Sequence, residues 1–325
     1  MGRSWGLVPL LLVVNLGLAG VLAVPLARVL ETDLRHKDAA AGMLYGFDHA
    51  WWSEWSERQT GWTASFGPEI FGSGFTFRNL ELLLKGYLPA GLFAGGHEEE
   101  EGRSRASPAT SSVDPVILGL GVLYMLLQTF LAGGVMGVLR TPQGAWTLRG
   151  LLHGSGFYFG RLARVALLAL LADLVVFRLN APFARWADRH ALEAVSESRA
   201  MAWALGHHVL LLLAVLFVHM LSSYAKVIVV VEERSSAVLA LLSSLSFCVA
   251  NLWRTCGQYL VMAAIGILVL IFWNGLDGLW DTTGYKTQIV TLVLLEALVA
   301  LRIGLRLALL GGQIALYRRL AGVVS

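Results

Sequence analysis

At 325 residues the chain is long enough for two soluble domains, but 56% of its residues are hydrophobic, only 14% are charged, and its mean hydropathy is +0.65. A soluble protein carries about 25% charged residues because its surface faces water, so this composition argues against a soluble fold. The net charge of +3 and the lack of a dense basic cluster argue against a nucleic-acid partner. We predict an all-α, polytopic integral membrane protein.

The first hydrophobic run extends from Leu7 to Leu30 and carries no charge before Arg28. It is longer than the roughly 7 to 15 apolar residues of a signal peptide, and no small-x-small cleavage site follows it. Residues 1–30 are therefore predicted to form a retained first transmembrane helix.

Residues 31–114 form the longest polar stretch and are predicted to be an extracytoplasmic loop. Four tryptophans lie among its charged residues: Trp51, Trp52, Trp55 and Trp62. An indole suits the lipid headgroup layer, where one side of the ring is wet, and a small cap packed on its own aromatic residues is the alternative. Residues 79–93 are too short and too charged to span, and residues 95–112, acidic and then rich in serine and proline, are predicted to be a flexible linker.

The second hydrophobic run, Val116–Leu139, begins after Asp114-Pro115, a start signal because proline suits the first turn of a helix. Five glycines in it would let neighbouring backbones approach closely: Gly119, Gly121, Gly133, Gly134 and Gly137. The GSGFYFG segment at residues 154–160 has a spacing similar to that of a nucleotide-binding loop. No strand precedes it and no acidic residue follows at the expected distance, so close helix packing is the better interpretation.

The third crossing is predicted from about Phe157 to Val176. The charged stretch Arg178–Arg199 is then predicted to be a loop that includes a short surface helix. The next apolar run, Ala202–Val231, predicts a helix on the order of 45 Å long, which is longer than a hydrocarbon core of ~30 Å requires. We expect the other membrane helices to pack around this fourth helix.

Two further crossings are predicted after the fourth helix. The charged corner Glu232-Glu233-Arg234 is expected at the water boundary, and the segment up to Asn251 is expected to form an amphipathic elbow along the cytoplasmic surface. The fifth crossing then runs from about Cys256 to Trp273 and the sixth from Thr287 to Leu310. Residues 115–325 are thus predicted to form a five-helix transmembrane bundle.

Charge in the short loops predicts the orientation of these six crossings. An even number of crossings places both termini on one side, and that side collects most of the short-loop arginines and lysines. Because positive residues favour the cytoplasmic face, both termini are predicted to be cytoplasmic, in a bacterial inner membrane.

The sequence contains no HExxH or CxxC motif and no constellation typical of a catalytic centre, so we predict neither an enzyme nor a metal site. Cys248 and Cys256 fit neither a redox pair nor a metal-ligand spacing and are predicted to be small apolar fillers.

Five ionisable residues are expected at membrane depth: Asp173, Lys226, Glu296, Arg302 and Arg306. Snorkelling cations and interhelical pairs are favoured over a proton or ion path, because a path needs acids at several depths.

Three histidines on the fourth helix are candidate ligands: His207, His208 and His219. An imidazole within a membrane helix can ligate a haem iron, the magnesium of a pigment or a transition metal. His207 and His208 fall near the predicted outer boundary, so only His219 lies at depth, where a hydrogen-bonded packing role is the alternative. We predict bound lipid and no cofactor, with contact to a pigment or haem through His219 as the exception.

The segment from Ser222 to Arg254 resembles a pattern in uncharacterised bacterial multipass membrane proteins, which are similar to the membrane domain attached to some glycerophosphoryl diester phosphodiesterases. The pattern is carried by Tyr224-Ala225-Lys226, by the corner Glu232-Glu233-Arg234-Ser235 and by Asn251. Ser243, Ser244 and Ser246 stand where the pattern has arginines on the wet face of the elbow, and the sequence contains no phosphodiesterase domain. The resemblance implies an architecture and no reaction.

Two functions fit these observations. The first is a non-enzymatic accessory or scaffold subunit of a larger bacterial membrane complex, such as an energy-converting one, with other integral membrane subunits and lipids as partners. The second is a lipid- or solute-handling membrane protein with a cavity beside the fourth helix and a polar stripe formed by Arg302 and Arg306.

Overall fold

A computed structural model describes residues 6–35, 37, 48–66, 114–141, 146–277 and 285–322. Throughout this part of the chain the secondary structure is helical, with eight α-helices and one short 3₁₀ helix, which confirms the predicted all-α fold class. The predicted surface segment 79–93, the linker 95–112 and most of the loop before the sixth crossing lie outside the described residues.

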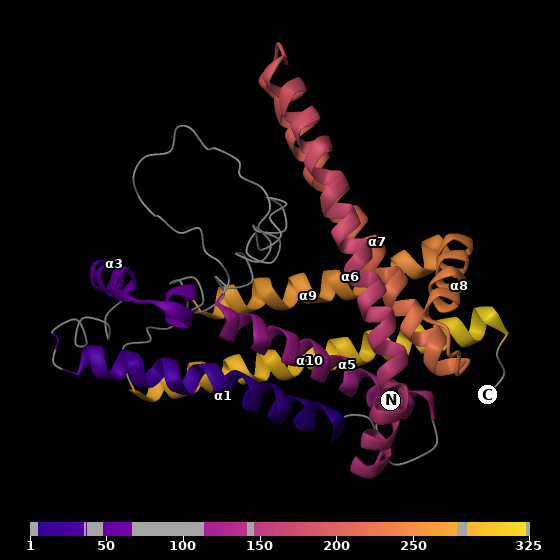
Figure 1. Ribbon diagram of the computed structural model, residues 1–325, viewed down its shortest axis with the longest axis horizontal. Helices are drawn as coiled ribbons and strands as arrows, with labels where there is room; N and C mark the ends of the chain where they lie inside the picture. Colours follow the sequence, from indigo (N-terminus) through magenta and orange to yellow (C-terminus); the bar gives the residue numbers. More distant parts are fainter. Residues whose placement is uncertain are drawn as a thin grey trace. The chain divides into compact units, whose positions relative to one another are not determined.

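The helices follow the predicted order along the chain (Figure 1). They are α1 (Leu7–Leu34), α3 (His49–Arg58), the 3₁₀ helix η2 (Gly61–Ser65), α5 (Pro115–Arg140), α6 (Leu148–Leu192), α7 (Glu197–Val231), α8 (Ala237–Ala250), α9 (Leu252–Asp277) and α10 (Tyr285–Ala321). Within the described ranges, four segments are long and apolar enough to cross a membrane: α1, α5, α7 and residues Leu252–Trp273 of α9. By length and hydropathy, these segments indicate an integral membrane protein with several transmembrane helices.

Helices α6 and α10 cover the third and sixth predicted crossings. At 45 and 37 residues they are the longest helices in the described part of the chain, and they are not among the four candidate spans. Four of the six predicted crossings therefore have the length and composition of a membrane span.

The helix expected within the stretch Arg178–Arg199 is present, but it is not separate from the third predicted crossing, because α6 continues without a break to Leu192. Pro182 lies inside α6, where it removes one backbone hydrogen bond. The alanine, leucine and arginine residues that follow it favour a helix, which explains why α6 continues. Only residues 193–196 separate α6 from α7.

The chain divides into two compact units, which we describe separately. Unit 1 comprises Met1–Trp55, Tyr124–Leu168 and Met220–Ser325, and unit 2 comprises Ser56–Leu123 and Ala169–His219. The predicted division at residues 30 and 114 remains a prediction.

The core of unit 1 surrounds the last two turns of α7. From Tyr224 to Val231 every side chain except that of Lys226 is buried. A helix that is apolar on all sides needs cover on all sides, and here α5, α6, α8 and α10 supply it. The expected packing of other helices around α7 is therefore found at its C-terminal end.

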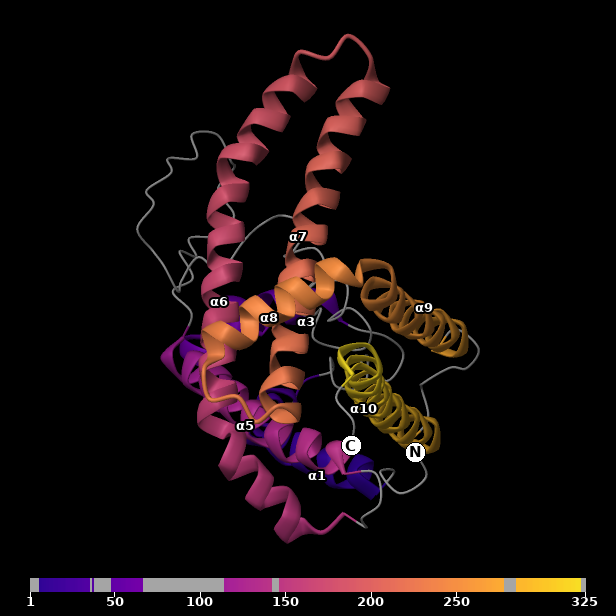
Figure 2. The same cartoon turned by 90° about the vertical axis from the view of Figure 1, so that its right-hand side faces the viewer.

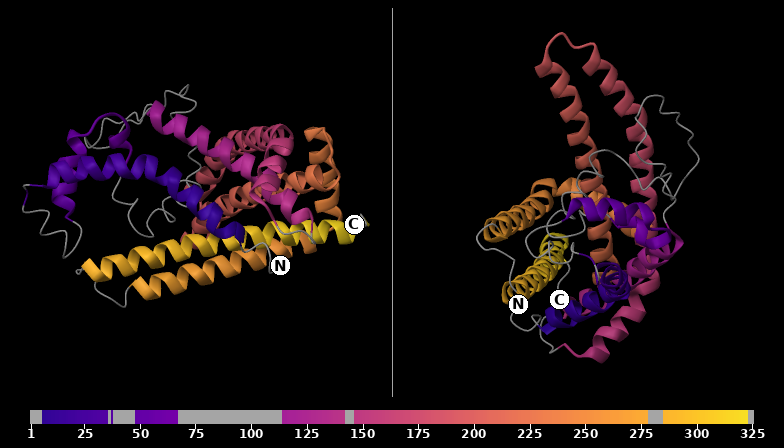
Figure 3. Two further views of the ribbon diagram at one scale, coloured as in Figure 1. Left: turned by 90° about the horizontal axis from the view of Figure 1, so that it is seen from below. Right: turned by 90° about the vertical axis from the view of Figure 1, so that its left-hand side faces the viewer.

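A second apolar cluster joins α1, α5, α6 and α10 through Leu7, Leu131, Leu151 and Leu307. Helix α10 also packs against α9 and against α1, and the three helices lie side by side in Figure 3. Together these contacts connect the first and last described helices of unit 1.

Helices α5 and α6 cross at Gly134, as the glycine-rich sequence predicts. A Cβ atom at Gly134 would overlap the carbonyl oxygen of Leu151 and the hydroxyl oxygen of Ser155. Gly133 lies in the same crossing, close to Tyr158. By contrast, Gly119 and Gly121 have open space around them, so only the C-terminal half of α5 uses its glycines for close packing.

Helix α8 occupies the segment for which an amphipathic elbow is predicted, with Ser236 accepting a hydrogen bond from the backbone N–H of Leu239 as its N-cap. The expected wet face of serines is wrong for Ser244, which is fully buried and donates to the carbonyl oxygen of Leu221 at 2.7 Å. The outward face carries large apolar side chains instead: Val238, Leu239, Leu242, Leu245 and Val249. Such a face suits lipid rather than water.

Unit 2 contains a helical hairpin. Residues 169–192 of α6 and residues 197–219 of α7 run antiparallel and are joined by the turn at residues 193–196 (Figure 2). The short connection makes the two arms neighbours along their length, which brings side chains far apart in the sequence into contact.

Candidate functional site

The first candidate is the charged corner between α7 and α8, in unit 1. Helix α7 ends at Val231, and Glu233 adopts a left-handed backbone conformation with φ of 56°. This conformation is uncommon for a residue with a side chain, so contacts must hold it. Arg161 donates to the carbonyl oxygen of Glu233 at 2.9 Å, and Arg140 pairs with the Glu233 carboxylate at 2.6 Å.

Arg140 and Glu232 extend these contacts to the ends of other helices. The Arg140 guanidinium also donates to the hydroxyl of Tyr158 at 3.1 Å and to the carbonyl oxygen of Val230 at 3.0 Å. The Glu232 carboxylate accepts hydrogen bonds from Arg234 and from the Tyr317 hydroxyl. Burial raises the pKa of Tyr317, and its hydrogen bond to Glu232 raises it further, so this hydroxyl stays protonated.

The corner therefore carries out a structural task. Arg318, in the last turn of α10, donates to the carbonyl oxygen of Arg140 at 2.8 Å, and Arg234 donates to Ser243 of α8 at 2.7 Å. These contacts fix the ends of α5, α7 and α10 to one another and to α8. Because both carboxylates are engaged by cations, neither is positioned as a free general base.

A second polar group lies between α7, α9 and α10. Gln313 is fully buried, accepts from Ser223 at 3.0 Å and donates to the hydroxyl of Tyr259 at 2.7 Å. Gln258, the residue before Tyr259 on α9, accepts from Tyr224 at 3.1 Å and donates to the carbonyl oxygen of Leu309 at 3.2 Å. Both amides have partners at each end, as buried amides require, so this group ties helices together.

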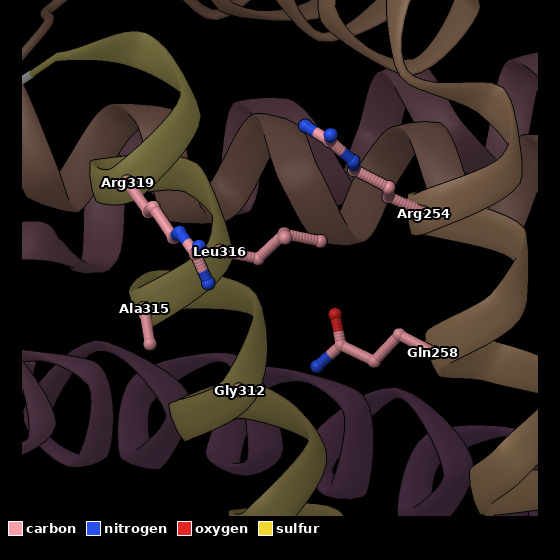
Figure 4. Close-up of a pocket in the computed structure, with 6 residues that line it drawn as sticks. All are labelled: Arg254, Gln258, Gly312, Ala315, Leu316 and Arg319. Carbon is pink, nitrogen blue, oxygen red and sulfur yellow. The ribbon is translucent and has the colours of Figure 1, made fainter.

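A pocket of about 330 Å³ opens beside Gln258, also within unit 1 (Figure 4). Its lining comes from the first turns of α9 and the last turns of α10: Arg254, Gln258, Gly312, Ala315, Leu316 and Arg319. A Cβ atom at Gly312 would lie 2.3 Å from Nε2 of Gln258, so a side chain there would displace the Gln258 amide. The sequence did not predict this pocket. Arg254 and Arg319 are far apart in the chain, and each resembles an arginine that simply lies at the membrane–water boundary.

The third candidate is an aromatic cluster on the hairpin of unit 2, which contains two of the predicted histidines. His207 is buried and its Nε2 lies 3.0 Å from Oδ1 of Asn180, across the hairpin. Trp186 lies between the arms, with ring centroids 5.0 Å from Trp203 and 4.5 Å from His190. The predicted ligand His207 thus has one ring nitrogen engaged by an amide and packs among aromatic rings.

The other two histidines differ from His207. Nδ1 of His208 lies 2.6 Å from the carbonyl oxygen of Ala204, one turn back along α7. His219 is exposed on the same helix. Among the described residues no group of three or more histidine, cysteine or acidic side chains is arranged to hold a metal ion.

Of the predicted intramembrane ionisable residues in unit 1, Lys226 and Arg306 lie close enough to repel each other. Asp173 and Glu296 each bury a carboxylate oxygen that has no hydrogen-bond partner, in unit 2 and unit 1 respectively. Lys226 is half-buried, and Arg302 and Arg306 are exposed. Among the described residues of unit 1, no ion pair joins any two of Lys226, Glu296, Arg302 and Arg306.

The tryptophans of the first loop pack on one another. Trp51, Trp52 and Trp55 of α3 are buried, with centroid separations of 4.9 to 6.0 Å, and Nε1 of Trp51 donates to Asp33 at 3.0 Å. This is the packing that a small cap requires. Trp62, in η2, makes an edge contact with Phe66 at 5.8 Å. The position of all four at a membrane interface remains a prediction.

No family model, curated protein or solved structure matches the chain. Its candidate sites are the charged corner, the pocket between α9 and α10, and the aromatic cluster on the hairpin.

Proposed function

We propose that the chain is a non-enzymatic accessory or scaffold subunit of a larger bacterial inner-membrane complex, and that it binds a partner through the tip of the α6–α7 hairpin. The observation that carries this proposal is the exposure of apolar side chains at the tip. Leu192 is 87% exposed and Val195 is 95% exposed, at a turn flanked by charged residues. Exposed apolar side chains rimmed by polar ones are typical of protein interaction sites.

The length of α6 supports a tip outside the membrane. With 45 residues, the helix is on the order of 68 Å long, more than twice a hydrocarbon core of ~30 Å. If the membrane segment ends near Val176, the remaining turns up to Leu192 extend roughly 24 Å beyond it. The aromatic cluster around Trp186 would then stiffen the arms and hold the tip away from the lipid.

Contacts at the charged corner support six crossings. Arg140, at the end of α5, pairs with Glu233, just after the end of α7. Two groups in contact lie at one depth, so the chain between them crosses the membrane an even number of times. Helices α6 and α7 therefore either both cross or both do not, and the apolar composition of α7 favours two crossings.

The other helices also pair through contacts at their ends. Arg318, at the end of α10, contacts Arg140, so α9 and α10 also cross as a pair. Gly6, before α1, lies against Trp146, after α5, so these two helices form the third pair. Because the shared end of these helices carries the cations of the corner, we propose that it is cytoplasmic, together with both termini.

A scaffold role also agrees with how the polar groups are used. The carboxylates of the corner and the two buried amides Gln258 and Gln313 are engaged in contacts between helices. An energy-converting complex is one candidate assembly, in which the exposed ring of His219 could contact a pigment or haem held by a neighbouring subunit. A visible absorption spectrum of the intact complex tests that contact.

The proposal is tested by purifying the full chain from its native membrane in a mild detergent. Wild-type protein should bring down partner subunits in fixed stoichiometry, and L192S/V195S should recover at least about tenfold less, since each lost apolar contact is worth about 1.5 kcal/mol or more. The matched control L192M/V195I keeps the tip apolar and should recover partners normally. Equal recovery with both double variants, or a wild-type chain that purifies alone, contradicts the proposal.

The alternative, a lipid- or solute-handling protein, predicts a cavity beside α7. The pocket found in unit 1 is lined by α9 and α10 and not by α7. A wild-type chain that purifies without partners but carries a transported solute would favour this alternative.

A further inference from the structure

We propose that the pocket between α9 and α10 binds the phosphate of an anionic phospholipid headgroup, held by Arg254 and Arg319. This site is independent of the partner-binding tip. It concerns what the protein binds at its cytoplasmic end.

The charge of the lining points to an anion. Arg254 and Arg319 are the only charged residues of the lining, and neither forms an ion pair or side-chain hydrogen bond with a described residue. By contrast, Arg140 and Arg234 each pair with a carboxylate. Figure 4 shows that the two side chains come from opposite helices and border one open space. Two cations facing one space repel each other until an anion neutralises them.

The chemistry of the two groups favours phosphate. A guanidinium offers paired N–H donors in a plane that matches two phosphate oxygens, and such charge-assisted hydrogen bonds are among the strongest in proteins. The Gln258 amide already has hydrogen-bond partners for its oxygen and its nitrogen, so it holds its position in the pocket wall and leaves the anion to the two arginines. A pocket of about 330 Å³ is large enough for a compact headgroup.

The position of the pocket favours a lipid over a free anion. Arg254 is the third residue of α9, and the candidate span begins at Leu252, so its guanidinium lies at headgroup depth. The adjacent Trp253 is 91% exposed, as expected of an indole at the membrane interface. Leu260 and Val261 farther along α9 are exposed apolar residues against which acyl chains can lie. Basic pockets at the cytoplasmic ends of membrane helices are typical sites for anionic lipids.

The test uses the full chain in a non-ionic detergent, titrated with a short-chain phosphatidylglycerol, with the matching phosphatidylcholine, and with inorganic phosphate. Native mass spectrometry measures the bound fraction. Wild-type protein should bind phosphatidylglycerol at least about tenfold more tightly than the other two ligands, and R254Q/R319Q should lose at least about tenfold of that affinity.

The matched control is R149Q/R164Q, which removes the same charge from two exposed arginines on the predicted cytoplasmic side and should bind within about twofold of wild type. If R254Q/R319Q does not fold, A315E is measured in its place. Ala315 lines the pocket and is exposed, so a larger side chain can be accommodated there. A carboxylate there should weaken binding at least about tenfold, while the uncharged A315Q should not.

Three outcomes would overturn the proposal. The first is equal affinity for phosphatidylglycerol and phosphatidylcholine. The second is binding of inorganic phosphate as tight as that of phosphatidylglycerol, which would assign the pocket to a free anion. The third is an equal loss of binding in R149Q/R164Q and R254Q/R319Q, which would mean that net charge and not the pocket attracts the lipid.

Discussion

Arg140 satisfies polar groups from three other segments with one guanidinium. It donates to the Tyr158 hydroxyl on α6, to the carbonyl oxygen of Val230 in the last turn of α7, and to the Glu233 carboxylate. Without it, the Val230 carbonyl would lose a partner at the point where α7 ends, and an unmet carbonyl costs about 1 to 3 kcal/mol. The charge of Arg140 thus stabilises a helix end. This structural role accounts for a charged residue near the membrane boundary without an ion path.

The buried thiol of Cys248 makes the stability of the protein depend on pH. This thiol is fully buried on α8, and burial raises its pKa from 9.0 to about 11. Between these values the unfolded chain loses the thiol proton and the folded protein keeps it. The contribution to stability is therefore complete below about pH 9 and declines as the pH rises towards about 11. The free energy of unfolding should fall by up to about 1.4 kcal/mol per pH unit from this group alone.

The comparison protein is C248A, which lacks the titrating group. In detergent micelles, its free energy of unfolding should change less than that of wild type between about pH 8 and about pH 10.5. Tyr317 also has a raised pKa, but it is present in both proteins and cancels from the difference. Identical pH dependence in the two proteins would contradict a buried, neutral Cys248.

Apolar runs in the sequence predict the positions of the helices better than they predict the residues at which the helices end. The four candidate spans match four predicted runs, because an uncharged stretch of about 20 residues has few other folded forms. The continuation of α6 past Arg178 was not predictable from apolar content, since charges and Pro182 resemble a loop. Likewise, the outward apolar face of α8 depends on which neighbours cover its serines, and sequence periodicity carries no such information.

The candidate sites also differ in how far the sequence predicts them. The charged corner was recognisable, because acidic and basic residues directly follow an apolar run. The pocket was not, because Arg254 and Arg319 become neighbours only when α9 packs against α10. The histidines were found by type, but the contact between His207 and Asn180 depends on the hairpin register.

The crossing of α5 and α6 provides a prediction about packing. In G134A the new methyl group would meet the backbone oxygen of Leu151, which cannot rotate away, as well as the Ser155 hydroxyl. The two helices must move apart, and we expect a loss of about 1 to 3 kcal/mol in the free energy of unfolding. Unfolding in mixed micelles of a mild detergent and dodecyl sulfate measures this loss.

Gly121, on the same helix, supplies the control. A Cβ atom there meets nothing within 4 Å, so G121A should be neutral or slightly stabilising through its better helix propensity. If both substitutions were equally neutral, α5 and α6 would not be in close contact at Gly134.

For the whole molecule, the proposed pairing of helices has two versions. Either α6 and α7 both cross the membrane, which gives six crossings, or neither does, which gives four and, in the proposed orientation, leaves the entire hairpin on the cytoplasmic side. Both versions keep Arg140, Glu233 and Arg318 at one depth, so these contacts alone do not separate them. The two versions differ in whether the hairpin tip and the start of α6 lie on the same side of the membrane.

Two single-cysteine variants decide between these topologies. In a C248A/C256A background, S198C places a thiol in the first turn of α7 beside the tip, and R149C places one at the start of α6; both positions are exposed. We expect a membrane-impermeant maleimide to label S198C in intact spheroplasts and to label R149C only after permeabilisation. The reason is that α7 is apolar over more than a membrane thickness, and leaving it in water would cost about 25 cal/mol for each Å² of apolar surface exposed. If S198C is protected together with R149C, the hairpin is cytoplasmic, and a partner at its tip would be a cytoplasmic one.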